Sequence, residues 1–549
     1  MNRMTALLSL ATAFLVACMP DAGCPDRWCG TAVVATAAEA DVLLPVATTQ
    51  DVGYSIGDLI FLKLADVGPE MNTVDPETFQ PELASSWEFE DERTIVFMLN
   101  PDAKWHDGVP VTAEDVVFTF DVYRDPVVAS PSRNRLLEIE SVAARSTGSV
   151  AFRFSHAYPE MLFDAVYHMR ILPSHLLDTV PHTDISSSPL GRSPIGNGPY
   201  RFVRWNAGQS IELVADPDFI LGRPGIRRII WRFVGDPTTA VAQLLAGEAD
   251  ILQVLSPEAQ GQVEARDDLR VVMWTPPIFY TFVQFNMRDA DGSNRPHPLF
   301  RDRAVREAIA MAVDREAIVN AVFPQGVVAR GPMAPVQWVW HGEYEQIPFD
   351  TAAARARLAE LGWADNDGDG LLDRDGRPLA FDLLLPSSST SRRRAGEIMQ
   401  AQLRRIGVTM TITALEFNAF LDRGAAHRFD AFFGGYGGDP SAATIAEVWE
   451  TGAPNNRGSY SNAEVDRLIG EARAASDLET VQDAWHRVVT LINDDVPAIW
   501  VYAGSPSAGV SARFENVSVR SDNFTATLWQ WRVPASQLID RDRITDATH

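Results

Sequence analysis

A lone carboxylate in a glycine-rich stretch is the first chemical feature of this sequence. The stretch reads FFGGYGGDPSAAT over residues 432–444, and Asp439 is its only charged residue. Glycine adds no side chain to packing and is costly to order, so the stretch suits a site where main chain and carboxylate both approach a ligand. The alternative is that Asp439 and Pro440 form only a capping turn ahead of a helix over 441–449.

An acidic loop is the second feature. The segment DNDGDGLLDRDG, residues 365–376, places Asp365, Asp367, Asp369 and Asp373 at positions one, three, five and nine. Alternating oxygen ligands around a tight turn are typical of a calcium loop. However, position twelve is glycine where an EF-hand has a bidentate Glu, and a strand pattern follows. The loop therefore predicts either a structural calcium ion, remote from any ligand cleft, or a solvated acidic turn; we expect no other cofactor.

Catalytic motifs are missing from the sequence. It contains no Gly-x-Ser-x-Gly elbow, no His-Glu-x-x-His pair and no Gly-x-x-x-x-Gly-Lys phosphate loop. The ten histidines are scattered without metal-ligand spacing. A secreted hydrolase is therefore disfavoured, and we expect a protein that is not an enzyme.

Chain length and net charge limit the number of lobes and the kinds of partner that we expect. The chain has 549 residues, which favours two or three lobes rather than one core. Its net charge of −26 repels nucleic acid and anionic lipid surfaces. We therefore expect no nucleic-acid partner. The composition is ordinary for a globular protein, and we expect a monomer.

The first residues predict export. Arg3 precedes a mostly apolar run from Thr5 to Ala17, which is shorter than a membrane-spanning helix. The run ends in LVAC, similar to a bacterial lipobox in which Cys18 is acylated; the alternative is an ordinary signal with a chance cysteine. Cys24 and Cys29 lie in the Ala-rich segment that follows, where they either pair in a small loop or have no folding role.

Helix and strand patterns alternate through the second half, which predicts an α/β protein. In the first half, TIVFMLN has the composition of a strand. The following VTAEDVVFTFDVY predicts a helix with a capping box formed by Thr112 and Asp115. Asp314 and Asp350 are expected to cap two later helices.

The order of segments resembles the extracytoplasmic solute-binding proteins of ABC importers, specifically the family that binds dipeptides, oligopeptides and nickel (bacterial extracellular solute-binding protein family 5). The resemblance is carried by PELASSW, AKWHDGVPVTAEDVVFTF, GNGPYRF, GEADI, FNM with FRDRAVREAIAMAVDREAIV, FDAFFGGYGGDP and SYSNAEVDRLIGEA, which span residues 81–472 in the family's order. It implies a two-lobe periplasmic-binding-protein fold with a hinge and an additional domain inserted in the first lobe.

Domain limits follow from the same resemblance. It implies a lipoprotein signal peptide over 1–18 and a tether over 19–38. Lobe I comprises 39–65, 193–285 and 504–549, the inserted domain 66–192, and lobe II 286–503.

The resemblance also implies a binding site. Peptide-binding members carry a Gly-Trp-x-x-Asp segment whose Asp pairs with the α-ammonium of the peptide, and Gly435, Tyr436, Gly437 and Asp439 match its spacing. A carboxylate is the natural partner of a desolvated ammonium, and bare main chain can pair with an extended peptide. Tyr280 and Asn286, on the strand expected at the lobe crossing, are further ligand-binding candidates.

The implied function is a lipid-anchored, extracytoplasmic binding protein that captures di- or oligopeptides in an interlobe cleft and delivers them to an ABC permease. A non-peptide solute such as an oligosaccharide, an opine or a nickel chelate is the alternative. A sensory relative of the same fold is a further one. The sequence fixes neither the ligand nor which membrane holds the anchor.

Overall fold

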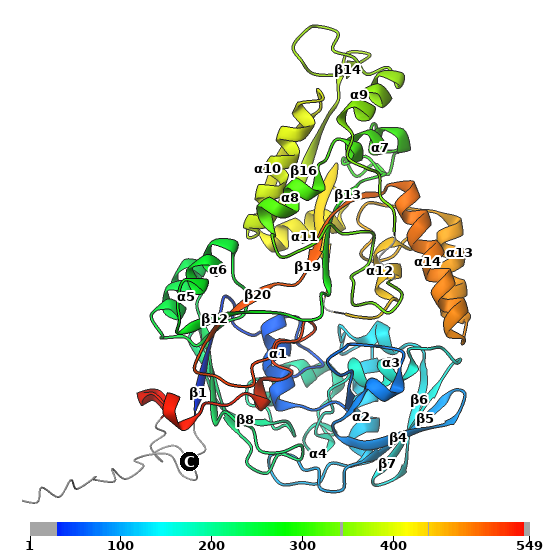
Figure 1. Ribbon diagram of the computed structural model, residues 1–549. Helices are drawn as coiled ribbons and strands as arrows, with labels where there is room; N and C mark the ends of the chain where they lie inside the picture. The colour runs from blue at the N-terminus through cyan, green and yellow to red at the C-terminus, as the bar shows by residue number, and fades with distance from the viewer. Residues whose placement is uncertain (1–29, 341–343, 438, 543–549) are drawn as a thin grey trace, which may run out of the picture.

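The computed structural model describes residues 30–340, 344–437 and 439–542, and it has two lobes joined by two chain segments (Figure 1). The expected signal peptide, Cys18, Cys24 and Cys29 lie outside the described residues. Lobe I, with the four-stranded sheet attached to it, forms the lower part of Figure 1, and lobe II forms the upper part.

Lobe I is built on a seven-stranded mixed sheet. Its strand order is β12 (Leu269–Met273), β20 (Ser507–Ser511), β11 (Ile251–Leu252), β1 (Thr31–Thr36), β10 (Arg228–Phe233), β9 (Ser210–Ala215) and β8 (Tyr200–Asn206). The lobe also contains α1 (Asp51–Ile60), α5 (Pro237–Leu245) and α6 (Pro257–Glu264). The sheet order brings residues from both ends of the chain together, because β1 lies two strands from β20.

The predicted tether over 19–38 is wrong at its end, because Thr31–Thr36 forms β1. This strand pairs in parallel with β10 on one side and with β11 on the other. Its sequence TAVVAT is buried on both faces, as a central parallel strand requires. The Ala-rich composition of the segment concealed this strand.

A four-stranded antiparallel sheet occupies the segment expected as an inserted domain, 66–192. Its order is β4 (Ala84–Asp91), β5 (Thr94–Leu99), β7 (Ser149–Phe154) and β6 (Ile139–Ser146), and β2 (Ala65–Asp66), β3 (Gln80–Pro81), α2 (Ala113–Arg124), α3 (Met161–Tyr167) and α4 (Ser174–Leu177) accompany it. The predicted capping box of α2 is confirmed: the main-chain N–H of Thr112 donates to the Asp115 carboxylate over 2.8 Å. Buried side chains from this sheet and from lobe I belong to one continuous apolar core.

Lobe II is built on a five-stranded sheet with helices on both faces. The strand order is β17 (Thr409–Leu415), β16 (Ala380–Pro386), β18 (Ala431–Tyr436), β13 (Phe279–Phe285) and β19 (Ala498–Gly504). The helices are α7 (Arg303–Met311), α8 (Arg315–Val322), α9 (Thr351–Glu360), α10 (Thr390–Arg404), α11 (Phe417–Ala425), α12 (Thr444–Trp449), α13 (Ala463–Ala474) and α14 (Leu478–Asp495). Asp314 and Asp350 cap α8 and α9 as predicted.

The two lobe crossings lie between β12 and β13 and between β19 and β20 (Figure 1). The expected first boundary at 285/286 is wrong, because β13 already pairs with β18 and β19 in the lobe II sheet. The crossing is the short segment 274–278. The second boundary, expected at 503/504, lies close to the observed link between Gly504 and Ser507.

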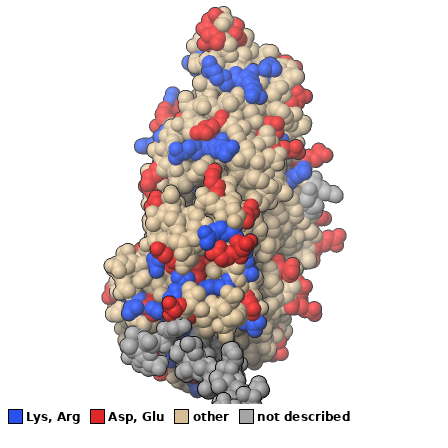
Figure 2. Space-filling view, turned by 60° about the vertical axis from the view of Figure 1, so that its left-hand side comes forward, with Lys and Arg blue, Asp and Glu red and all other residues tan. Residues whose placement is uncertain are grey.

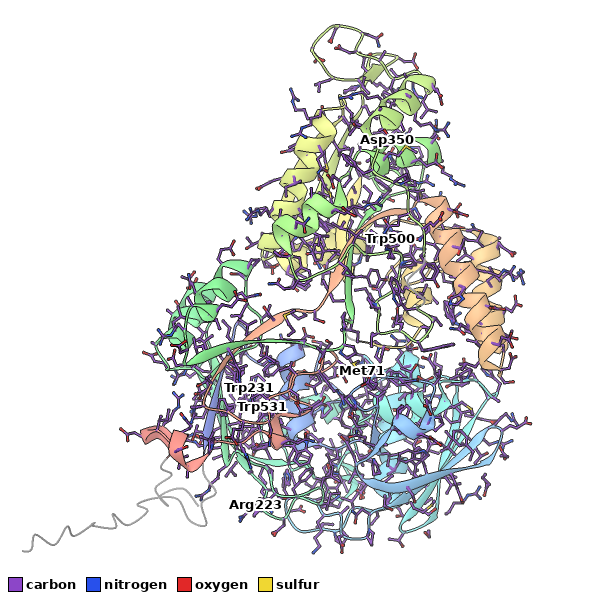
Figure 3. The ribbon with its side chains drawn as sticks, viewed as in Figure 1. Met71, Arg223, Trp231, Asp350, Trp500 and Trp531 are labelled. Atoms are coloured by element: carbon purple, nitrogen blue, oxygen red, sulfur yellow. The ribbon has the colours of Figure 1, made fainter. Side chains whose placement is uncertain are left out.

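Large buried aromatic side chains mark the separate cores of the lobes (Figure 3). Trp231 and Trp531 lie together in lobe I, and Trp500 lies in lobe II; each is at most 3% exposed. On the face shown in Figure 2, acidic and basic side chains are interspersed. Among the described residues, no helix is both long enough and apolar enough to span a bilayer.

Candidate functional site

A cavity of about 910 Å³ lies between the two lobes and is lined by residues of both. Aromatic rings dominate its wall. From the lobe I side come Tyr54, Tyr167, Trp274 and Phe524; from lobe II come Phe279, Phe282, Phe420, Phe432, Tyr436 and Tyr502. A concave site of this size with an apolar wall and a few polar groups is typical of small-molecule binding.

The glycine-rich stretch reaches this cavity as the end of β18. Gly434, Gly435, Tyr436 and Gly437 line it, so the predicted contacts Gly435, Tyr436 and Gly437 are brought together. The glycines also make room for neighbouring side chains. A Cβ on Gly435 would lie 2.6 Å from Nη2 of Arg392, and one on Gly437 would lie 2.9 Å from the Phe279 ring. Bare backbone here lets lobe II's own side chains pack against the strand.

Asp439 lies beside the cavity but is not among its lining residues, and the structure gives it protein partners. Its Oδ2 lies 2.9 Å from Nη2 of Arg135, a residue of the segment between α2 and β6. Its Oδ1 accepts the main-chain N–H of Ser441 over 2.8 Å, which is the turn that the alternative interpretation expected. Asp439 therefore connects lobe II to the lobe I side, and its role toward a ligand ammonium stays a prediction.

Arg135 has a second carboxylate partner in lobe II. Its Nη2 lies 3.0 Å from Oε2 of Glu447, and the same carboxylate accepts the Tyr436 hydroxyl over 2.5 Å. Asp439 and Glu447 together raise the pKa of Arg135 above its ordinary value against the effect of burial. Burial and the charge of Glu447 raise the pKa of Tyr436. One cation thus holds two carboxylates of the facing lobe.

A second interlobe connection runs through Glu160. Its carboxylate accepts the Ser441 hydroxyl over 2.6 Å and the indole N–H of Trp338 over 3.2 Å, both from lobe II. Burial, with the charge of nearby Asp164, raises the pKa of Glu160 to about 7. Protonation of this carboxyl is therefore coupled to contact between the lobes.

The other two predicted contacts do not line the cavity. Asn286 is fully buried, and its amide donates to the carbonyls of His427 and Phe429 over 2.9 and 2.8 Å. Tyr280 is 3% exposed and packs among Phe282 and Trp500. Both side chains have packing roles in lobe II, so we do not retain them in the proposed site.

The lobe I wall of the cavity carries carboxylates that are already paired. Asp58 makes a two-bond ion pair with Arg170, with N–O distances of 2.5 and 2.8 Å. Asp522 lies 2.6 Å from Nη2 of Arg520. These pairs satisfy charge within lobe I itself.

The lobe II wall carries two arginines, which sequence reasoning missed. Arg392, in the first turn of α10, and Arg457, between α12 and α13, line the cavity without a carboxylate within 4.0 Å in the described parts of the chain. Arg392 is one of three consecutive arginines and Arg457 stands alone in NNRGSY, and neither segment carries a motif that selects the residue.

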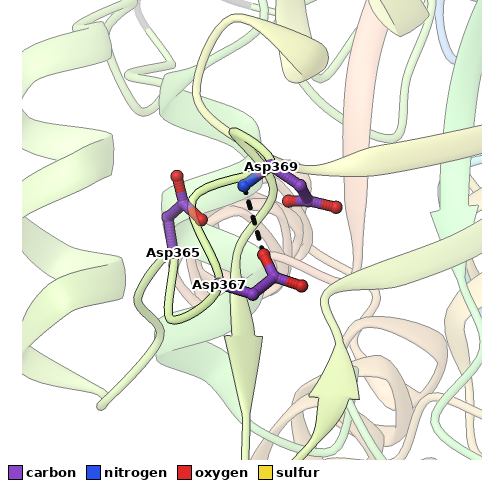
Figure 4. Close-up of side chains that lie close together, drawn as sticks. All are labelled: Asp365, Asp367 and Asp369. Carbon is purple, nitrogen blue, oxygen red and sulfur yellow. Dashed lines mark hydrogen bonds between the residues drawn. The ribbon is translucent and has the colours of Figure 1, made fainter.

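The acidic loop lies at the tip of lobe II, away from the cavity. Asp365, Asp367 and Asp369 are exposed and offer oxygens within 4.8 Å of one another (Figure 4). Asp373 stands apart on β14 (Asp373–Arg374), which pairs with β15 (Arg377–Pro378), and its carboxylate accepts the Asn366 amide over 3.0 Å. Three of the four predicted ligands are thus brought together, and calcium binding stays a prediction.

Comparison with known proteins adds to this geometry. The family model for bacterial extracellular solute-binding proteins, family 5, matches residues 78–456. The oligopeptide-binding protein AppA of Bacillus subtilis is 27% identical over 522 residues, covering 91% of this chain and 92% of that protein.

Solved structures share the fold. AppA in complex with a nonapeptide superposes with a TM-score of 0.76 at 24% identity, covering 92% of this chain and 99% of AppA. NikZ of Campylobacter jejuni in complex with Ni(L-His) superposes with a TM-score of 0.79 at 24% identity, covering 91% of this chain and 99% of NikZ. A Pseudoalteromonas dipeptide-binding protein in complex with Met-Leu superposes with a TM-score of 0.74 at 22% identity, covering 92% of this chain and 100% of that protein. The predicted two-lobe α/β fold is confirmed, and the chain belongs to the bacterial extracellular solute-binding proteins of family 5.

Proposed function

We propose that this protein is the lipid-anchored binding subunit of an ABC importer and captures di- or oligopeptides between its lobes. The observation that carries the proposal is the interlobe cavity of about 910 Å³, with walls from both lobes and bare strand backbone at Gly434, Gly435 and Gly437. A binding protein needs such a compartment, because closure removes the ligand from water and makes lobe position depend on occupancy.

A peptide is the favoured ligand for two reasons. Main chain at the end of β18, where Gly435 is half-buried and Gly437 is exposed, can bond an extended peptide backbone. The aromatic wall suits bulky apolar side chains. AppA and the Pseudoalteromonas protein, which share the fold, were solved with peptides, whereas NikZ was solved with Ni(L-His). The fold therefore accommodates several ligand classes, and the cavity of this chain must decide among them.

Identification of the bound compound tests the peptide assignment. The protein is purified without denaturation, and native mass spectrometry compares its mass before and after unfolding. We expect a released peptide of a few residues. A released sugar or metal chelate would contradict the peptide ligand while leaving the binding function intact, and an enzymatic turnover of the compound would contradict the transport assignment.

The lipid anchor rests on the LVAC sequence alone. We expect the protein to partition into the detergent phase of a Triton X-114 extract of the producing cell. Cys18→Ala should move it to the aqueous phase while ligand binding stays unchanged, because the residues that line the cavity fall between positions 51 and 524. An aqueous wild-type protein would contradict anchoring.

A further inference from the structure

The charges of the cavity are divided unequally between its two walls. The buried carboxylates of the lobe I wall are matched: Asp58 pairs with Arg170, and Asp522 with Arg520. Asp51, the remaining acidic residue of that wall, is exposed to solvent. A ligand cation therefore meets no unpaired buried carboxylate on the lobe I wall.

The guanidinium groups of the lobe II wall retain free donors. Arg457 donates from Nη1 to the Leu421 carbonyl over 2.8 Å, and its guanidinium carbon lies 5.2 Å from the centre of the Phe432 ring. Arg392 lies against Gly435 at the end of β18. Burial lowers the pKa of both arginines, and across the segments that the structure describes no carboxylate offsets it. Each charge is thus desolvated without a carboxylate partner among the described residues; Arg392 has only the hydrogen bond with the Tyr502 side chain to offset its burial.

Gln284 supplies a second, independent observation. This side chain of β13 lines the cavity and is 1% exposed, and its amide nitrogen has no hydrogen-bond partner among the described residues. It lies against Gly458, the residue after Arg457: a Cβ on that glycine would be 2.9 Å from the Gln284 amide carbon. A buried donor without an acceptor is costly, so the position calls for an acceptor that the described residues do not provide.

We propose that Arg457 and Gln284 form a carboxylate subsite on the lobe II wall, with Arg392 as a second cationic contact, and that the ligand is an acid recognised through its carboxylate. The inference rests on the proposed function, because it assumes that the ligand occupies the interlobe cavity. A carboxylate can accept from a guanidinium and an amide at once, and charge-assisted bonds of this kind are the strong ones. The amine of the ligand then contributes less to affinity than its carboxylate does, since Asp439 already pairs with Arg135.

The test uses matched peptide libraries as probes. Random tetrapeptides of neutral side chains are prepared with free ends, with an amidated C-terminus, and with an acetylated N-terminus. Each library is incubated with protein stripped of its ligand, and the retained peptides are quantified by mass spectrometry after gel filtration. We expect amidation to reduce retention about tenfold or more and acetylation to reduce it less than amidation does.

Single-residue variants test whether Arg457 and Gln284 cause the preference for a free carboxylate. Arg457→Gln and Gln284→Leu should each lower affinity for the free-carboxylate peptides about tenfold and leave the weak binding of the amides unchanged. Arg423→Gln is the matched control, because Arg423 is a half-buried arginine of lobe II that does not line the cavity and donates to the Arg428 carbonyl over 2.8 Å. Thermal melts without ligand confirm that each variant is folded; if Arg457→Gln does not fold, the libraries on the wild type decide alone.

The outcomes separate this inference from the proposed function. Equal retention of amidated and free-carboxylate peptides would overturn the subsite and leave peptide binding standing. A larger loss on acetylation than on amidation would also overturn it, because the amine would then be the recognised group. Retention of none of the libraries would contradict peptide binding, and the inference with it.

Discussion

The two walls of the interlobe cavity differ in whether their charged side chains are paired with an opposite charge within the protein. On the lobe I wall, Asp58 and Asp522 each have an arginine partner in the same lobe. On the lobe II wall, Arg392 and Arg457 have aromatic and carbonyl neighbours but no carboxylate within 4.0 Å among the residues described. The buried carboxylates of the lobe I wall are thus paired within the protein, whereas the lobe II wall offers positive charge that a ligand carboxylate can pair with. The contrast indicates that specificity resides mainly in lobe II.

The largest loss of stability is expected from breaking the ion pair between Asp58 and Arg170 in lobe I. The Asp58 and Arg170 side chains are 8% and 12% exposed, so Asp58→Ala leaves a nearly buried guanidinium unpaired. We expect the free energy of unfolding to fall by about 3–5 kcal/mol. Denaturant titration measures it. The double variant Asp58→Leu with Arg170→Met should recover most of the loss; a single variant as stable as wild type would show that the pair is not what completes this wall.

The ion pair between Asp439 and Arg135 is the next test of how the two lobes differ, because Asp439 has two candidate partners: Arg135 and the ammonium group of the ligand. If its main partner is Arg135, then Asp439→Asn and Arg135→Gln should each weaken binding of the co-purified ligand by about three- to tenfold through less stable closure. The double variant should then be no weaker than either single one. Calorimetric titration measures all three.

A loss of ligand affinity that is specific to Asp439→Asn would instead indicate that Asp439 contacts the ligand. If that variant costs far more affinity than Arg135→Gln, and only for ligands with a free amine, Asp439 binds the ligand ammonium as the sequence predicts. The same experiment therefore distinguishes a lobe-to-lobe contact from a ligand contact.

A smaller, pH-dependent effect is expected at Glu160. Its pKa is raised from 4.5 to about 7 because burial disfavours the charged form. The folded protein therefore holds a proton that the unfolded chain releases, and stability falls as pH rises from about 4.5 to about 7. Glu160→Gln removes this dependence, so its melting temperature relative to wild type should increase between pH 5 and pH 8. A constant difference across that range would show that Glu160 is not a buried titrating group.

The smallest effect is expected at the acidic loop. If calcium binds Asp365, Asp367 and Asp369, calcium should raise the melting temperature by a few degrees over chelator, and Asp367→Asn should abolish the difference. Identical midpoints for wild type with calcium and with chelator would remove the prediction. Ligand affinity should stay the same in both, because the loop is at the tip of lobe II (Figure 1) and none of its residues lines the cavity.

Local signals in the sequence predicted much of the fold. The capping box at Thr112 and the caps at Asp314 and Asp350 depend on residues three or fewer positions apart, and all three are confirmed. The β1 strand was missed because its Ala-rich sequence acquires strand character only from pairing with β10 and β11. The first crossing was misplaced for a similar reason, since only sheet pairing shows that β13 belongs to lobe II.

The site was predicted in part. Gly435, Tyr436 and Gly437 share one strand end, so their proximity was readable from their spacing. The partner of Asp439 is 304 positions away, at Arg135, and no local pattern joins the two. Arg392, Arg457 and Gln284 come from α10, a loop and β13, so only the folded arrangement shows that they line one cavity.

Small-angle X-ray scattering of the ligand-stripped protein, before and after adding back the compound that co-purifies with it, tests the central claim most directly. The account predicts a smaller radius of gyration with the compound, because the lobes close over the cavity. It also predicts a weaker response in Arg457→Gln at equal ligand concentration. Superimposable profiles at saturating compound would contradict a binding protein that closes around its ligand.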